Sequence, residues 1–246
     1  MKTLVKLEIT RTLRNRKFMF FSVLYPAMLF LGISLTYKSG ATAGDTGLSA
    51  LAYLMTSMAA FGAMTAVLMG NAERIARERE KGWVRQLRLT ALPGRGYVTA
   101  KIASAATVSL PSILIVLILG ATVKDVHLKA WQWAGIGVAT WAGSLVFAAL
   151  GVAIGYLATA DAARPISMIF YFGLAILGGL WTPLYLFPHW LQTMAGYLPA
   201  APYAALGRSI ELGNAPHAKD VTVLAVYLLL FAGAAAWLYR KDTRKA

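Results

Sequence analysis

The sequence predicts an all-α integral membrane protein with six transmembrane helices. Hydrophobic residues make up 58% of its 246 residues and charged residues only 14%, whereas about 25% is typical of globular chains. Six apolar stretches each reach the roughly 20 residues that a helix needs to cross a bilayer. Because backbone groups in hydrocarbon must be satisfied internally, we expect each stretch to be helical. The predicted spans cover residues 18–37, 48–70, 98–122, 131–157, 166–186 and 221–239.

The first span has two features of a signal peptide, a basic flank before it and Ala41-Thr42-Ala43 after it. Its apolar stretch is longer than the 7–15 residues, approximately, of a signal-peptide core. We therefore interpret residues 18–37 as a membrane anchor that is retained.

Residues 1–17 form a basic segment with a narrow apolar stripe. Val5, Ile9 and Leu13 recur at a spacing of four, with lysines and arginines between them. This pattern is typical of an amphipathic helix that lies along the membrane surface, with its cations near anionic headgroups. An ordinary basic flank of the first span explains the same residues, so both readings stay open.

The distribution of cations predicts the orientation of the chain. With six spans, both termini lie on one side together with the connection at residues 71–97, and 19 of the 24 lysines and arginines fall on that side. An excess of Lys and Arg marks the cytoplasmic face. We therefore expect cytoplasmic termini, and we interpret the net charge of +14 as a topology signal rather than as a nucleic-acid surface.

The connection at residues 71–97 divides at Gly82. Before it, Asn71–Lys81 is expected to extend the second span as a solvated helix, supported by the i, i+4 charge pairs Glu73/Arg77 and Arg74/Glu78. Pro93-Gly94 closes the part that follows.

The part after Gly82 has two different faces. At 100° per residue, Trp83, Val84 and Leu87 fall on one side of a helix, whereas Lys81, Arg85 and Arg88 fall on another. A short amphipathic helix here could dock on a soluble partner. It could equally place Trp83 and Leu87 in the membrane interface, where tryptophan is common.

One pattern in this connection resembles a known family. It reads Glu78-Arg79-Glu80-x-Gly82-x-x-Arg85-x-Leu87-Arg88-x-Thr90-x-Leu92-Pro93, with Tyr97 and Lys101 after it. This is similar to the cytoplasmic signature of ABC transporter permeases of the ABC-type-2 exporter class, and the six-span layout matches over nearly the whole chain. Trp83 and Ala91 depart from the usual pattern, in which a small residue and a proline are common.

The resemblance implies a membrane subunit of an ATP-driven exporter in the bacterial inner (cell) membrane. In that family the connection holds a coupling helix that seats in a groove of a separate ATP-binding subunit. Carried over, the contact residues are Glu80, Gly82, Arg85, Leu87 and Arg88, and we place Trp83, which departs from the family pattern, at the same contact. The other implied partners are a second copy of the chain or a related permease, and membrane lipids, but no nucleic acid.

No cofactor is expected on this chain. It has no Gly-Lys-Ser/Thr phosphate loop, so ATP and Mg would bind the partner subunit. No predicted span carries a charge near its middle, which disfavours an ion-driven transporter. There is no cysteine, and His127, His189 and His217 lie far apart in sequence, so we expect no metal site.

Residues 187–213 hold two short apolar helical segments, and Pro202 and Gly213 are suited to begin and end the second. Each is too short to span and too apolar to stay in water, so we expect re-entrant helices in the outer leaflet, as the resemblance also implies. The aromatic residues that could line an exit path are Trp181, Tyr185, Trp190, Tyr197 and Tyr203. An interfacial aromatic belt is the alternative reading.

Two functions other than transport remain open for this sequence. A lipid-modifying membrane enzyme would need a polar cluster, for which His189, Arg208, Glu211 and His217 are the candidates. A non-transporting sensor or immunity protein would act without an ATPase.

Gly151-x-x-x-Gly155 is a small-residue packing motif that serves either contacts within the subunit or a dimer contact.

Overall fold

The computed structural model describes residues 2–37, 40–44, 47–82 and 94–244, and these form helices and connections without a strand. A single isolated bridge joins Thr42 and Ser49. The helices are α1 (Lys2–Leu13), α2 (Arg16–Met19), the π-helical turn η1 (Phe20–Leu24), α3 (Tyr25–Ser34), α4 (Ala50–Glu80), α6 (Gly94–Val123), α7 (Ala130–Leu157), α8 (Ala160–Leu177), the 3-10 turn η3 (Leu184–Leu186), α9 (His189–Ala195), α10 (Ala200–Glu211) and α11 (Ala218–Arg244).

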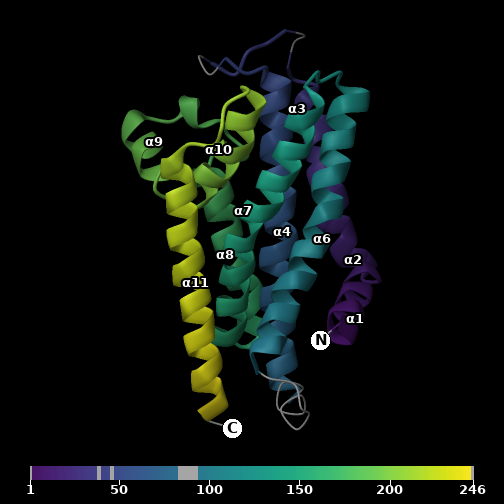
Figure 1. Cartoon of the computed structure of the whole chain (residues 1–246), viewed down its shortest axis with the longest axis vertical. Helices are drawn as coiled ribbons and strands as arrows, with labels where there is room; N and C mark the ends of the chain where they lie inside the picture. Colours follow the sequence, from purple (N-terminus) through teal and green to yellow (C-terminus); the bar gives the residue numbers. More distant parts are fainter. Residues whose placement is uncertain (1, 38–39, 45–46, 83–93, 245–246) are drawn as a thin grey trace.

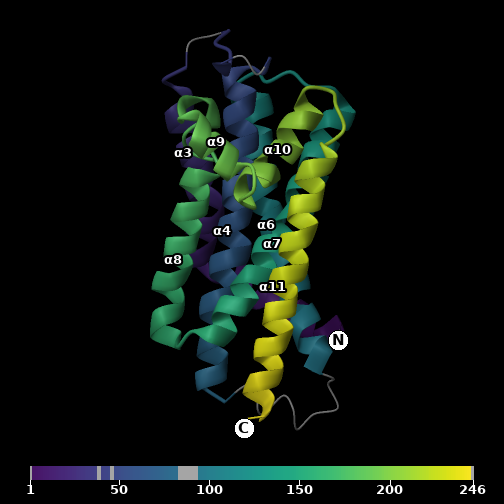
Figure 2. The same cartoon turned by 90° about the vertical axis from the view of Figure 1, so that its left-hand side faces the viewer.

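The long helices run along the long axis of one elongated bundle (Figure 1). Both termini lie at the same end, called here the terminal end, and α9 and α10 lie at the opposite, distal end. Helix α4 occupies the centre and packs against α3, α6, α7, α8 and α10. After a quarter turn, α8 and α11 lie on opposite flanks of the bundle (Figure 2). The all-helical class predicted from composition is therefore confirmed.

Five described helices are long and apolar enough to cross a membrane. They are Ala50–Glu80, Ser104–Val123, Ala130–Leu157, Ala160–Leu177 and Ala218–Asp242, and each corresponds to one of the last five predicted spans. Almost all of the apolar window of α4 is buried, whereas most of the windows of α8 and α11 are exposed. In a membrane such exposed apolar faces contact lipid or another membrane helix.

The first predicted span is made of three consecutive helical pieces. Its apolar part, Phe20–Ser34, is shorter than the other candidates, so the sixth span stays a prediction. The π-helical turn η1 ends directly before α3, whose first turn contains Pro26. Proline has no N–H to donate, so it is tolerated at this point, where the regular helical hydrogen bonding is already interrupted.

The fifth predicted span was placed too far along the chain. Helix α8 begins at Ala160 and ends at Leu177, whereas residues 166–186 were expected to be one helix. Gly178 lies so close to α10 that an added Cβ would be 2.3 Å from the Cβ of Ala200, and Gly179 has a φ of +68°. The chain therefore turns at these two glycines, and residues 180–183 leave the helix.

The second predicted span continues into the charged connection, as expected. Helix α4 extends to Glu80, Lys81 caps it, and Gly82 interrupts it with a φ of +67°. Glu73 and Arg77 form the predicted pair at 2.6 Å. The expectation of a solvated extension is wrong for one face, because Asn71, Ala72, Ile75, Ala76 and Glu78 are all buried.

Gly151 and Gly155 allow α7 to approach this buried face of α4. A Cβ at Gly151 would lie 2.7 Å from the backbone oxygen of Leu68, and one at Gly155 would lie 2.8 Å from the Cβ of Ile75. Both distances are shorter than real Cβ contacts. The motif therefore serves packing within the subunit.

A Gly151→Ala variant is expected to destabilise the protein by about 1–3 kcal/mol, because the added methyl group forces α7 away from α4. Gly173 on α8 is a matched control, since a Cβ there meets nothing within 4 Å. Gly173→Ala is expected to be neutral or up to about 1 kcal/mol stabilising. Unfolding of both variants in detergent micelles measures the difference, and equal stabilities would contradict the close contact.

Candidate functional site

The best-defined polar site lies at the terminal end, where α4 stops. Three consecutive charged residues, Glu78, Arg79 and Glu80, form the last turn of α4. Successive side chains on a helix point about 100° apart, so these three face different neighbours. We call these residues and their partners the junction. Among the predicted contact residues, Glu80 and Gly82 are described, whereas Trp83, Arg85, Leu87 and Arg88 lie outside the described residues.

Glu78 joins α4 to α6 and α1. Its carboxylate accepts from the Lys101 ammonium at 2.8 Å and from the Arg11 guanidinium at 3.2 Å. The side chains of Lys101 and Glu78 are only 1% and 6% exposed, whereas that of Arg11 is 59% exposed. Breaking a buried pair leaves an uncompensated charge in low dielectric. The Glu78–Lys101 contact therefore fixes the beginning of α6 against the end of α4.

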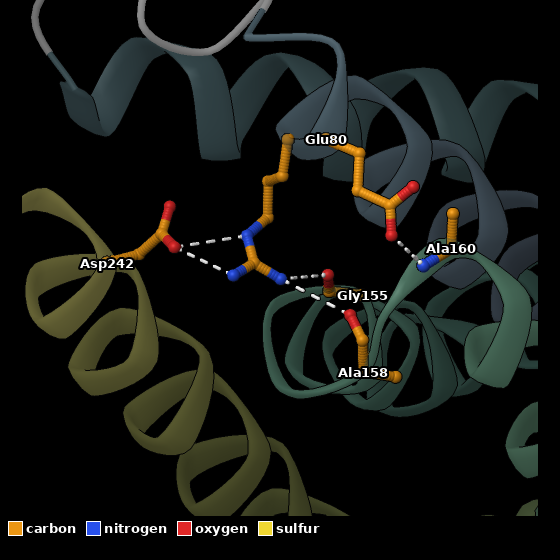
Figure 3. Close-up of polar contacts among 6 residues, drawn as sticks. Glu80, Gly155, Ala158, Ala160 and Asp242 are labelled. Atoms are coloured by element: carbon orange, nitrogen blue, oxygen red, sulfur yellow. Dashed lines mark hydrogen bonds and ion pairs between the residues drawn. The ribbon is translucent and has the colours of Figure 1, made fainter. Parts of the chain in front are cut away.

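Arg79 joins α4 to the ends of α7 and α11. Two of its guanidinium nitrogens donate to Asp242 Oδ1, at 2.7 and 3.3 Å, and the third donates to the backbone oxygens of Gly155 and Ala158, at 3.0 and 3.4 Å (Figure 3). The guanidinium also lies 5.4 Å from the centre of the Tyr156 ring. Carbonyls in the last turn of a helix have no partner within it and carry partial negative charge. Arg79 satisfies two of them for α7.

Glu80 joins α4 to the start of α8. Its Oε1 accepts from the backbone N–H of Ala160 at 2.7 Å (Figure 3). The N–H groups of a first helical turn are open donors, and a carboxylate there is favourable. Thr159 caps the same helix by accepting from Ala162 N at 3.4 Å. Glu80, expected to contact a partner subunit, thus has one oxygen engaged within the chain.

The junction therefore ties the end of α4 to five other helices, α1, α6, α7, α8 and α11. Sequence reasoning recognised the three-residue motif and Lys101 but missed Arg11 and Asp242 as their partners. Asp242 could have been recognised as an ion-pair partner, because it is the single acidic residue within the basic tail 240–245. No sequence feature marks Arg11 as a partner of Glu78, because it is one of several cations in residues 1–17.

The five aromatic residues proposed for a path differ in their surroundings. Trp181 is half-buried against Phe61 and Phe172, with ring centres 5.3 and 5.5 Å apart. Tyr185 packs on Tyr53 at 6.2 Å.

The other three path candidates differ in exposure. Trp190 and Tyr197 are exposed, at 63% and 60%. Tyr203 is 1% exposed, and its hydroxyl donates to the Thr140 oxygen at 3.0 Å. It fills the space above Gly143, where an added Cβ would lie 2.5 Å from its ring. In this conformation Tyr203 packs α10 against α7 and does not line an open space.

Arg208 holds α10 at the distal end. Its guanidinium donates to Ser57 Oγ at 2.8 Å and to the Gly179 oxygen at 2.9 Å, and it lies 3.8 Å from the centre of the Tyr53 ring. It therefore links α10 to α4 and to the turn that follows α8. Sequence reasoning placed Arg208 only among possible catalytic groups.

Of the four polar residues considered for a lipid-modifying enzyme, Arg208 and Glu211 lie near each other on α10. Within residues 2–37, 40–44, 47–82 and 94–244, no group of three or more His, Asp or Glu residues could hold a metal ion. Glu211 lines a distal cavity to which neither His189 nor His217 contributes.

Two comparisons with known proteins agree with each other. The sequence model of a family described as "ABC-2 family transporter protein" matches residues 31–238. The Bacillus subtilis (strain 168) protein named "Putative transport permease YvfS" is 30% identical over 235 residues, which cover 96% of this chain and 95% of that protein.

Proposed function

Because this chain belongs to the ABC-2 family of transporter proteins, we propose that it is the membrane subunit of an ATP-driven exporter. A separate ABC ATP-binding subunit binds ATP and Mg and docks on the segment 71–97. The chain forms the translocation path with a second copy of itself or with a related permease. Support for a transport subunit comes from the family and from the five apolar helices.

The observation that carries the proposal is the junction. The segment 83–93 connects α4 to α6 directly, and the residues just before it bind the ends of α1, α6, α7, α8 and α11. A force applied to this segment acts on α4 at Glu80 and on α6 at Gly94. Ion pairs and packed helix ends are stiff contacts that pass such a displacement to neighbouring elements. A partner that docks on the segment 83–93 would therefore displace the helix ends that meet at the junction.

Motion at the terminal end would reach the distal end along α4. Helix α4 extends from the junction to Ser57, which holds Arg208 and with it α10. Tyr185, Trp190 and Tyr197 are exposed in the observed conformation and would be available to a path between two copies, whereas Trp181 is packed against Phe61 and Phe172. Tyr203 would join them only when α10 separates from α7. The exposed apolar faces of α8 and α11 would contact the second copy and lipid.

We further propose that the chain lies in the bacterial inner (cell) membrane with six spans and cytoplasmic termini. The common position of both termini and the excess of cations at that end support this orientation. The pieces α2, η1 and α3 follow one another without a break, and at 1.5 Å per residue they reach about 28 Å, close to the hydrocarbon thickness. Helices α9 and α10 would be the re-entrant pair, and α1 the interfacial helix.

The test is co-expression of the tagged full chain with an ABC ATP-binding subunit encoded beside its gene. We expect the two to co-purify from detergent and to hydrolyse ATP together. Replacing the phosphate-loop lysine of the ATPase with alanine should abolish hydrolysis without dissociating the complex. Failure of any ABC ATPase to associate with the chain, when the chain is folded and in the membrane, would overturn the proposal.

A further inference from the structure

One side of α1 is exposed and basic. Counted at 100° per residue, an arc of about 140° around this helix holds exposed residues only among those whose side chains the structure describes, namely Lys6, Leu7, Thr10, Arg11 and Arg14. Helical hydrogen bonding continues as far as Arg14, whose N–H donates to the Thr10 oxygen at 3.0 Å. We call these five residues the basic face.

The rest of α1 is turned toward the protein. Helix α1 packs against α6 on the outside of the bundle, toward the terminal end (Figure 1). Thr12 is only 2% exposed and Ile9 is half-buried. By helical register Glu8, the single acidic residue of α1, falls about 60° beyond Arg11 and outside the arc. The basic face therefore combines three cations with one hydroxyl and one apolar side chain, and it points away from the bundle.

Exposed apolar residues follow the basic face in the chain. The turn at Asn15 leads into α2 and η1, where Phe20, Phe21 and Leu24 are 47%, 57% and 41% exposed. An anionic phospholipid has the same order of chemistry, a charged phosphate followed by hydrocarbon chains. Cations at a membrane surface attract such headgroups, and basic amphipathic helices lie at the boundary between headgroups and chains. A soluble acidic partner would match the cations but not the apolar side chains that follow them.

Arg11 belongs both to the basic face and to the junction. Its side chain is 59% exposed, and one terminal nitrogen donates to Glu78 at 3.2 Å. A guanidinium has five N–H donors in a planar fork, so Arg11 can bond a phosphate oxygen while it stays on Glu78. An exposed ion pair is weak partly because a long side chain must be held still. A phosphate that holds Arg11 would strengthen its contact with Glu78.

We propose that the basic face binds the phosphate of an anionic phospholipid, and that Arg11 links this lipid to Glu78 in the junction. Lys6 and Arg14 supply attraction for the headgroup. Arg11 converts lipid binding into a firmer attachment of α1 to α4. The assignment rests on the proposed orientation, in which the terminal end meets the cytoplasmic leaflet, and not on the proposed ATP coupling.

The first experiment measures lipid binding to the purified full chain, without any ATPase, by native mass spectrometry from detergent micelles. We expect dioleoyl phosphatidylglycerol to bind at least tenfold more tightly than dioleoyl phosphatidylcholine. Lys6→Gln/Arg14→Gln should lower the affinity for phosphatidylglycerol about tenfold or more, because both cations lie near the headgroup.

Lys81→Gln/Arg164→Gln is the matched control, since it removes two exposed cations at the terminal end from α4 and α8 (Figure 2). It changes the net charge equally and should bind phosphatidylglycerol like the wild type. Equal affinities of the two double variants, or no preference of the wild type for phosphatidylglycerol, overturn the proposal. Lys6→Gln/Arg14→Gln that binds the lipid normally but loses association with the ATPase assigns the basic face to a protein partner and also overturns it.

The second experiment tests the link through Arg11 by thermal unfolding in mixed micelles. Phosphatidylglycerol should raise the unfolding temperature of the wild type above its value in phosphatidylcholine, because a ligand of the folded state stabilises it. Arg11→Gln keeps Lys6 and Arg14, so it should still prefer phosphatidylglycerol but lose most of this rise. An equal rise in Arg11→Gln and the wild type contradicts the link. Equal stabilisation by glycerol phosphate, which lacks the chains, contradicts the lipid assignment.

Discussion

A Lys101→Met variant is expected to lose about 3 kcal/mol of unfolding free energy, because it leaves the buried Glu78 carboxylate without its most deeply buried partner. Removing one member of a buried ion pair costs about 3–5 kcal/mol. The lower value is expected here, since Arg11 still lies 3.2 Å from Glu78. Reversible unfolding of the purified chain in mixed micelles measures the loss.

The double variant Glu78→Met/Lys101→Met distinguishes the ion pair from simple packing. Replacing both members of a buried pair by apolar residues of similar size is often neutral, so the double variant should be more stable than Lys101→Met alone. Lys81→Met is the control, because Lys81 is an exposed cation at the end of the same helix and should change stability by no more than about 0.5 kcal/mol. Equal losses of stability in Lys101→Met and Lys81→Met would show that the Glu78–Lys101 ion pair does not hold α6 against α4.

A Leu87→Asp variant is expected to abolish association with the ATP-binding subunit while membrane insertion and monomer stability stay unchanged. Leu87 shares the apolar face of its segment with Trp83 and Val84, and the proposal places this face in a groove of the partner. A carboxylate buried without a partner costs several kcal/mol, enough to reduce the affinity of a typical interface by a thousandfold or so. Co-purification of the two subunits reports the loss.

Leu89→Asp provides a matched substitution, since residue 89 lies about 200° around a helix from residue 87. Association should survive this change if the face of Trp83, Val84 and Leu87 is the docking face. If Leu87→Asp still co-purifies with the ATPase in full yield, the coupling assignment is wrong, and the alternative that Trp83 and Leu87 lie in the membrane interface is favoured.

Local patterns predicted much of this protein. Runs of apolar residues located five helices that are long and apolar enough to cross a membrane, although the fifth predicted span was shifted along the chain. The i, i+4 pairing of Glu73 with Arg77 and the break at Gly82 were both confirmed. The motif from Glu78 to Pro93 indicated the family, which the comparisons show. These features depend on residues close together in the chain, where hydropathy and helical periodicity decide the structure. The orientation, the coupling segment and the six-span count stay predictions.

Contacts between distant segments were decided by the tertiary structure. Arg79 meets Asp242 across 163 positions of sequence, and Tyr203, expected in a path, is buried because Gly143 leaves space for its ring. The burial of the Glu211 side chain also becomes visible only once α10 is packed against its neighbours. The sequence alone determined which segments are helical and apolar. How those helices pack decided which side chains meet, because residues far apart in the chain have no common periodicity that predicts their distance.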